Sequence, residues 1–201
     1  ITVGEGLIEK NVLVGTSLVD MYAKCGKLAK AQEMLDEILI RDVISWNAII
    51  GGYTEHKQDA YYALSLFEMM MKDQVDPNKI TLMCILKACG RIDAREEGNW
   101  MHNKVVKDGL ESDTLIQVTL IDMYMKLGCF RAARRVFENV LNPKLCIWNA
   151  IITGYAQHKH GFEVFELFEC MHRKGPRPDE TTYTNIFKVC TDLNAMAEGK
   201  I

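Results

Sequence analysis

The chain has 201 residues, of which 48 % are hydrophobic and 25 % are charged, and its formal net charge is −3. This balance is typical of a well-packed globular protein, and it excludes a chain that binds nucleic acid or membranes through a global excess of positive charge. No apolar run approaches the roughly 18 residues of a membrane-spanning helix, so we expect no membrane partner.

The chain opens at Ile1 without an initiator Met or a basic leader, so we interpret it as a piece of a longer protein. From residue 12 onward, apolar residues recur with helical spacing, and short polar breaks such as CGK (25–27) separate paired helical segments. Turn signals then divide the chain into predicted helical hairpins at 12–42, 43–78, 79–113, 114–144 and 145–179, followed by a truncated unit at 180–201.

Strands are not expected, because no stretch shows sustained two-residue alternation. The prolines fall only in the predicted linkers, where they do not interrupt a helix. The sequence therefore predicts an all-α fold.

The hairpins belong to a longer internal repeat. The segment SLVDMYAKCGKLAKAQEML (17–35) aligns with TLIDMYMKLGCFRAARRVF (119–137), and SWNAIIGGYTEH (45–56) aligns with IWNAIITGYAQH (147–158), both at an offset of 102 residues. The offset falls to 101 between ITLMCILKACG (80–90) and TTYTNIFKVCT (181–191), which indicates one extra residue in the HKQDAYY stretch. A single hairpin cannot bury its apolar faces, so the repeat predicts an α-solenoid with a concave face.

The first helix of each unit, helix A, has two distinct faces when positions are counted from the first residue of the unit. Positions 4, 7 and 11 carry large residues such as Trp46 and Trp148, which we expect to pack against the second helix, helix B. Positions 2, 5, 9 and 13 share an arc of roughly 80° on the other side. Position 2 is mostly apolar and position 5 is variable, which predicts a groove lined by repeated pockets. Alternatively, neighbouring repeats bury this face.

The segments DMYAKCGKLAKAQEMLDEI (20–38) and RDVISWNAIIGGY (41–53) resemble the pentatricopeptide repeat family, specifically its PLS subclass. In that subclass short (S), 35-residue (P) and variant (L) units alternate, and Gly98 and His102 match residues typical of an L unit. The resemblance assigns S to 12–42 and 114–144, P to 43–78 and 145–179, L to 79–113, a truncated L to 180–201, and the tail of a preceding L to 1–11.

The family resemblance implies a right-handed superhelix that binds single-stranded RNA with one base per repeat. In the family, position 5 and the last residue of each unit select the base, because short polar side chains can hydrogen-bond a base edge or orient it. The pairs here are Thr16 with Asp42, Asn47 with Asn78, Met83 with Asp113, Val118 with Lys144, and Asn149 with Asp179, with Thr184 in the truncated unit. They imply the footprint 5′-G-C-N-N-U-3′, in which the third and fourth pairs have no base assignment.

Two further sets of residues take family roles. The aliphatic or small residues at position 2 would sandwich the bases, and these are Leu13, Ile44, Ile80, Leu115 and Cys146. Cations at position 13 would contact phosphate, and these are Lys24, Arg91 and Lys126. With so few cations in a negatively charged chain, we expect modest affinity and a dependence on salt.

We expect neither a metal site nor a catalytic site. Cys84 and Cys89 are five residues apart, no CxxC occurs, and His158 and His160 have no neighbouring cysteine pair. The seven cysteines are an odd number, and Cys84, Cys89 and Cys190 occupy apolar helical positions, so we expect buried free thiols in a reducing compartment.

Function follows from the resemblance. The HxE…CxxC zinc signature of a deaminase domain does not occur, so we predict a module that is not an enzyme and needs no cofactor. It would direct organellar RNA processing or C-to-U editing in a mitochondrion or chloroplast, with accessory editing-factor proteins as candidate partners. The alternative is a protein-binding scaffold similar to a tetratricopeptide array, whose unit has 34 residues.

Overall fold

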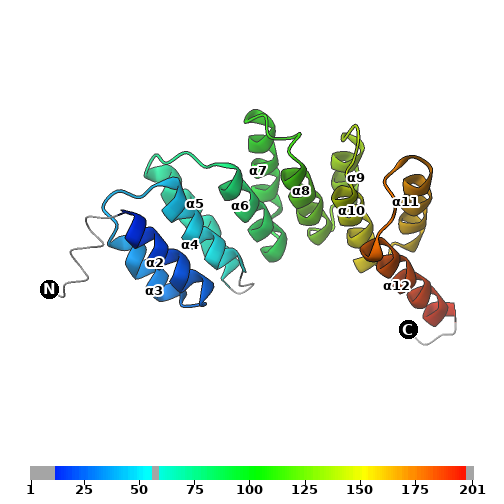
Figure 1. Ribbon diagram of the computed structural model, residues 1–201, viewed down its shortest axis with the longest axis horizontal. Helices are drawn as coiled ribbons and strands as arrows, with labels where there is room; N and C mark the ends of the chain where they lie inside the picture. The colour runs from blue at the N-terminus through cyan, green and yellow to red at the C-terminus, as the bar shows by residue number, and fades with distance from the viewer. Residues whose placement is uncertain (1–11, 56–58, 198–201) are drawn as a thin grey trace. The chain divides into compact units, whose positions relative to one another are not determined.

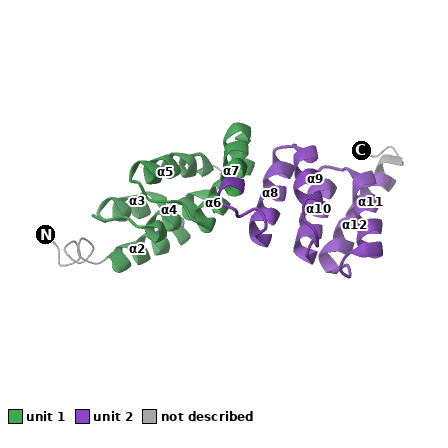
Figure 2. Ribbon diagram, turned by 90° about the horizontal axis from the view of Figure 1, so that it is seen from above, with its two compact units in different colours: residues 1–105 green, residues 106–201 purple. Residues whose placement is uncertain are grey.

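The computed structural model describes residues 12–55 and 59–197, and all regular secondary structure in these ranges is helical (Figure 1). The all-α prediction is confirmed for these residues. The predicted tail at 1–11, residues 56–58 of the stretch with the extra residue, and 198–201 of the truncated unit lie outside them. The chain forms two compact units, Ile1–Val105 and Val106–Ile201 (Figure 2).

The helices alternate between the A and B positions of successive hairpins. The A helices are α2 (Val12–Lys24), α4 (Val43–Glu55), α6 (Lys79–Ile92), α8 (Thr114–Lys126), α10 (Leu145–Gln157) and α12 (Glu180–Ala197). The B helices are α3 (Leu28–Asp36), α5 (Ala60–Lys72), α7 (Arg95–Lys107), α9 (Phe130–Glu138) and α11 (Gly161–Lys174). Each predicted unit therefore begins at the first residue of an A helix. We number the repeats one to six in chain order.

The last residue of a repeat is the N-cap of the next A helix in several places. The Asn78 side chain accepts hydrogen bonds from the backbone of Ile80 and Thr81, and the Asp113 carboxylate accepts from Leu115 and Ile116. A side-chain oxygen at this point satisfies N–H groups that have no partner within the helix. The polar linker residues are thus held at the start of each following A helix.

The first and fourth repeats have the same kind of turn between helix A and helix B. Gly26 has φ 70° and Gly128 has φ 65°, both in the left-handed region that favours glycine. Both turns are closed by equivalent backbone bonds, from Lys27 N to Tyr22 O at 2.9 Å and from Cys129 N to Tyr124 O at 2.8 Å. The following B helices have only 9 residues, which accounts for the 31-residue length of these repeats.

Within each unit, the A helices pack side by side and the B helices pack against them. In the first unit α4 contacts α2, α3, α5 and α6, and in the second α10 contacts α8, α9, α11 and α12. Trp46 and Trp148 are 0 % and 3 % exposed, which confirms that they are core residues. The apolar side of helix A thus faces its own hairpin, and positions 2 and 5 lie away from it.

Two equivalent glycines allow adjacent A helices to approach closely. A Cβ atom on Gly52 of α4 would lie 2.6 Å from the Cβ of Ala23 in α2. A Cβ atom on Gly154 of α10 would lie 2.3 Å from the Cγ of Met125 in α8. Both distances are too short for a side chain to fit without movement of its neighbour.

Two arginines form ion pairs between successive repeats. Arg41 pairs with Asp73 at 3.3 Å and lies over the Trp46 ring at 5.9 Å in the first unit. Arg134 pairs with Glu138 at 2.7 Å and with Glu166 of the next B helix at 3.2 Å in the second unit. Arg41 and Arg134 therefore link neighbouring hairpins.

Candidate nucleic-acid interface

In the second and fifth repeats, the position 5 asparagine bonds directly to the last residue of its own repeat. Asn47 Nδ2 donates to Asn78 Oδ1 at 3.0 Å. Asn149 Nδ2 lies 3.0 Å from both carboxylate oxygens of Asp179. Two of the predicted pairs are thus brought together across 31 and 30 residues of sequence.

A threonine from the next repeat joins each pair. Thr81 Oγ1 donates to Asn47 Oδ1 at 2.6 Å, and Thr182 Oγ1 donates to Asn149 Oδ1 at 2.7 Å. We call Asn47, Asn78 and Thr81 the second-repeat cluster, and Asn149, Asp179 and Thr182 the fifth-repeat cluster. The threonines were not among the predicted site residues.

The backbone of the following helix fixes the oxygen of the last residue. Asn78 Oδ1 accepts from Ile80 N at 2.9 Å and from Thr81 N at 3.2 Å, which leaves the Asn78 amide nitrogen as the donor end of the side chain. Asp179 Oδ1 accepts from Thr182 N at 3.0 Å, and the second oxygen of this carboxylate can only accept. The two clusters therefore share a framework and present opposite hydrogen-bonding groups at the last position.

The charge of Asp179 is stabilised by the same hydrogen bonds. The backbone N–H of Thr182 is the main cause that lowers the pKa of this carboxyl below its ordinary value, and bonds from the Asn149 and Thr182 side chains lower it further. At neutral pH the fifth-repeat cluster thus holds a carboxylate where the second-repeat cluster holds a neutral amide.

The remaining predicted pairs do not form this arrangement. Thr16 is 8 % exposed, and its hydroxyl has no hydrogen-bond partner among the described residues. The Asp42 carboxylate instead caps α4 through Ile44 N at 3.1 Å and Ser45 N at 2.8 Å. In the third and fourth repeats, position 5 is held by the half-buried apolar residues Met83 and Val118.

Two predicted residues at the edges of these pairs have local roles. Lys144 is the N-cap residue of α10, but its side chain makes no cap hydrogen bond. Thr184 is exposed, and its hydroxyl donates to Glu180 O at 2.8 Å within α12.

The position 2 side chains are open to solvent. Leu13, Ile44, Ile80 and Leu115 are between 53 % and 75 % exposed, and Cys146 is also exposed. The alternative that neighbouring repeats bury these residues is therefore wrong. Ile44 lies one turn before Asn47 on α4, and Ile80 lies in the first turn of α6 just after Asn78, so the second-repeat cluster has exposed aliphatic residues on both sides in the chain.

The three candidate phosphate-binding cations each have an acidic partner. Lys24 and Lys126 pair with the carboxylates one turn earlier, Asp20 and Asp122, at 2.6 Å in both cases. Arg91 bonds to the carbonyl oxygens of Thr54 and Glu55 at the end of α4, and to the Glu55 carboxylate at 3.5 Å. A phosphate at any of these cations would compete with a carboxylate.

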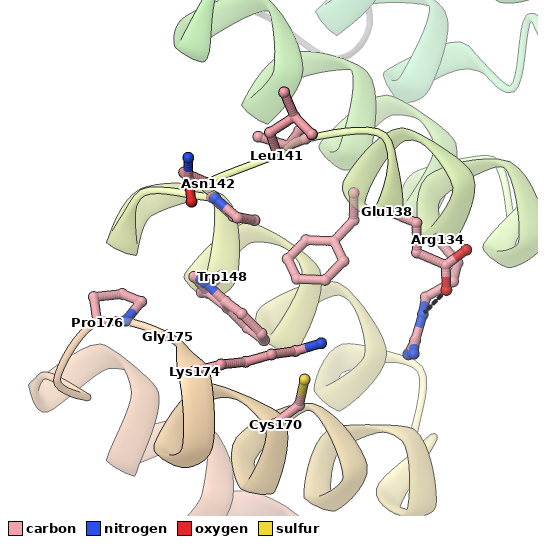
Figure 3. Close-up of a pocket in the computed structure, with 12 residues that line it drawn as sticks. Arg134, Glu138, Leu141, Asn142, Trp148, Cys170, Lys174, Gly175 and Pro176 are labelled. Carbon is pink, nitrogen blue, oxygen red and sulfur yellow. Dashed lines mark hydrogen bonds and ion pairs between the residues drawn. The ribbon is translucent and has the colours of Figure 1, made fainter.

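The hairpins also contain cavities. One of about 560 Å³ in the second unit is lined by residues of α9, α10 and α11, with Trp148 above Cys170 and Lys174 (Figure 3). Another, about 700 Å³ in the first unit, is lined by Phe67, Met71 and Trp100 among others. Neither of these two contains a residue predicted to select, sandwich or neutralise a nucleotide, because those residues lie on the A helices and at the linker positions just before them.

The cysteine predictions are only partly correct. All seven cysteines are free, and burial is the main cause that raises the pKa of Cys89 to about 12. Cys84 and Cys190, which we expected to be buried, are half-buried, because both lie near the edge of the apolar face of their helices. Within the described residues, no group of three or more histidine, cysteine or acidic side chains is placed to hold a metal ion, and no helix is long and apolar enough to cross a membrane.

Comparison with protein families explains this repeated arrangement. The model of the PPR repeat family matches residues 41–91 and 143–192, and the model of the single PPR repeat matches 16–43 and 118–141. The chain belongs to the PPR repeat family. A chloroplastic pentatricopeptide repeat-containing protein of Arabidopsis thaliana is 36 % identical over 94 % of this PPR chain and 26 % of its own length. A second Arabidopsis thaliana PPR protein is 35 % identical over 96 % of this chain and 27 % of its own length, so the chain spans about a quarter of these relatives.

Solved structures show the same fold. A crystal structure of the pentatricopeptide repeat protein PPR10 in complex with an 18-nt psaJ RNA element superposes with a TM-score of 0.76 and 18 % sequence identity. The superposition covers 99 % of this PPR chain and 32 % of the PPR10 chain. At this identity the likeness establishes the PPR fold of the chain and not its ligand.

Proposed function

We propose that this PPR chain binds single-stranded RNA, with one base at each repeat, through the surface formed by positions 2 and 5 of its A helices. The observation that carries the proposal is the pair of polar clusters, because at the same repeat position one offers the Asn78 amide nitrogen as a donor and the other offers the Asp179 carboxylate as an acceptor. The binding of RNA by PPR10, which has the same fold, supports it.

The two clusters favour different pyrimidines. Cytosine has an acceptor at N3, which the Asn78 amide nitrogen of the second repeat can meet with a donated hydrogen bond. Uracil has an N3–H donor, which the Asp179 carboxylate of the fifth repeat can accept. The footprint 5′-G-C-N-N-U-3′ remains our proposal for the whole array. Its C and U are best supported, because the second and fifth repeats form these clusters among the described residues.

The exposed aliphatic side chains supply the second part of the interaction. Covering an isoleucine that is more than half exposed with an apolar surface stabilises the complex, and the face of a base offers such a surface. Leu13, Ile44, Ile80 and Leu115 would therefore lie between successive bases, with Cys146 in the equivalent place in the fifth repeat.

The phosphate contribution should be small. A single strand changes the logarithm of the binding constant by about 0.7 per tenfold change in salt for each phosphate neutralised, so three cations set an upper limit of about 2. Because Lys24, Arg91 and Lys126 are already paired with carboxylates, we expect a slope below that limit.

By this proposal the chain belongs to the PLS subclass and is the targeting part of an organellar RNA-processing or C-to-U editing factor, without catalytic activity of its own. The chloroplastic designation of one relative agrees with this location. Accessory editing-factor proteins are the proposed protein partners.

The test is binding of the 201-residue chain to short single-stranded RNA that carries GCNNU, compared with a scrambled RNA of the same composition. We expect tighter binding to GCNNU, and Asn149→Thr should shift the preference at the last base from U toward G by roughly tenfold, since one or two base hydrogen bonds change. Asn142→Thr is the matched control, because Asn142 is exposed in a linker and lines the cavity away from the A-helix surface.

Equal affinity for both RNAs would refute sequence-specific binding. Absence of RNA binding by the folded chain would refute the proposal as a whole, and would favour the alternative of a protein-binding helical scaffold.

A further inference from the structure

The threonine of each polar cluster has a hydrogen-bonding role that capping alone does not explain. Its hydroxyl accepts from the backbone N–H of the last residue of the preceding repeat, at 3.1 Å from Asn78 N to Thr81 and 3.3 Å from Asp179 N to Thr182. This is the capping-box contact expected at the third residue of a helix. The hydroxyl proton is not needed for that contact and is free to be donated elsewhere.

The proton is directed at the asparagine. A threonine hydroxyl has a single proton, and in both clusters its shorter distance is to the Asn Oδ1. The distances are 2.6 Å to Asn47 against 3.3 Å to Asn78 for Thr81, and 2.7 Å to Asn149 against 3.0 Å to Asp179 for Thr182. Both threonines are 0 % exposed, so water does not compete for this proton.

The hydrogen bond from the threonine determines which polar group the asparagine offers to a ligand. Its Oδ1 accepts from the threonine, and one N–H of its Nδ2 is donated to the last residue of the repeat. The second N–H is then the polar hydrogen left for a ligand. A rotated amide would place Oδ1 against Asp179 oxygens and Nδ2 against a hydroxyl that would lose its acceptor.

Position 3 of the second repeat shows that the capping contact can form without a bond to the position 5 residue of the preceding repeat. Ser45 occupies position 3 of the second repeat, accepts from Asp42 N at 3.0 Å, and donates to Asp42 O at 2.9 Å. It therefore caps α4 without a bond to Thr16, whose hydroxyl has no partner among the described residues.

The remaining repeats complete the pattern. Where position 5 is the apolar Met83 or Val118, position 3 of the next repeat is the buried isoleucine Ile116 or Ile147. A threonine at position 3 thus accompanies an asparagine at position 5 of the preceding repeat in both cases, and an isoleucine accompanies an apolar residue in both cases.

We propose that Thr81 and Thr182 are positioning residues for base selection by the repeats that precede them, so that three residues and not two define the base at the second and fifth repeats. This inference rests on the proposed RNA-binding function. It also means that part of the specificity of one repeat is encoded in the next.

The experiment compares Thr182→Val, Thr182→Ser and Ser45→Ala in the full chain, using RNAs that carry each of the four bases at the last position of GCNNU. Thr182→Val removes the hydroxyl with little change of shape, and we expect the preference for U over C to fall from roughly tenfold to within about twofold. Thr182→Ser keeps the hydroxyl and should keep the preference. Ser45→Ala removes an equivalent capping bond, and should lower thermal stability without changing preference at any base.

A second readout is independent of RNA. In the free protein, solvent exchange of the Asn149 side-chain amide protons, measured by NMR, should be faster in Thr182→Val and unchanged in Ser45→Ala. Should Thr182→Val fail to fold, Thr81→Val tests the same inference in the other unit, through the second base and the Asn47 amide.

The outcomes separate the two proposals. If the unmodified chain shows no preference for U, the proposed base code fails. If it prefers U and Thr182→Val retains the full preference, the positioning role of the threonine is refuted while RNA recognition stands.

Discussion

The second repeat (43–78) and the fifth (145–179) have A helices of 13 residues that are identical at seven positions, yet they differ in the residues around their polar clusters. The second ends in an amide, Asn78, and has exposed isoleucines at position 2 of its own and the next repeat. The fifth ends in a carboxylate, Asp179, with Cys146 and a threonine in those places. The two repeats thus share an Asn and Thr framework, and by our proposal the second depends more on apolar contact and the fifth more on charge.

The largest expected difference concerns Gly52 and Gly154, the glycines at which adjacent A helices approach closely. Gly52→Ala should lower the free energy of unfolding by about 1–3 kcal/mol, because its Cβ would overlap the Cβ of Ala23, which moves only with the backbone of α2. Gly154→Ala should also lower the free energy of unfolding, but by less than Gly52→Ala, because its two nearest contacts are the Cγ and Sδ atoms of the buried Met125, which can move without the backbone of α8. Urea unfolding followed by circular dichroism measures both, and equal losses would show that the two helix contacts are equally rigid.

The next prediction exchanges the last residues. Asp179→Asn should change the preference at the fifth base from U to C, and Asn78→Asp should change the preference at the second base from C to U, each by roughly tenfold. Each variant keeps a side-chain oxygen at the N-cap, so the helices should be retained. Binding to RNAs that differ only at these two bases measures the exchange. An exchange in one repeat but not the other would show that the position 2 residues also decide the base.

The smallest effect is a dependence on pH that the fifth repeat, which ends in Asp179, should show and the second repeat, which ends in the neutral Asn78, should not. Because the folded-state pKa of Asp179 is lowered, its contribution to stability is fully present above the ordinary pKa of an aspartate and is lost as the pH falls through the lowered value. The chain should therefore be more stable than Asp179→Asn at neutral pH, and this difference should shrink below about pH 4. Melting temperatures of both proteins measured between neutral and acidic pH test this. A difference that stays constant would mean that the hydrogen bonds to Asp179 do not favour its charged form.

Some site features were open to prediction and were missed. The ion pairs Asp20–Lys24 and Asp122–Lys126 have the spacing of neighbours on one helix face, so the competition for these lysines was predictable from spacing alone. Thr81 and Thr182 stand three residues after the N-cap, where a capping box is expected, but that motif describes only the bond within the helix. The bond to the asparagine of the preceding repeat carries no local signature.

The burial of Thr16 could not be predicted from its position. It occupies position 5 like Asn47 and Asn149, but it is buried while they are half-buried and bonded to the last residue of their repeat. A threonine side chain is too short to reach as far as an asparagine amide. Whether Thr16 contacts Asp42, which lies 26 residues later, depends on the separation between α2 and the start of α4.

The sequence by itself determined the helical hairpins, their first residues, the turn glycines and the tryptophan core, because helical periodicity, caps and turns depend on residues close together in the chain. Only the tertiary structure decided which polar pairs meet, which threonines join them, and where a glycine is needed between A helices. Those features depend on the distance between helices from successive repeats, and that distance follows from the packing of buried side chains.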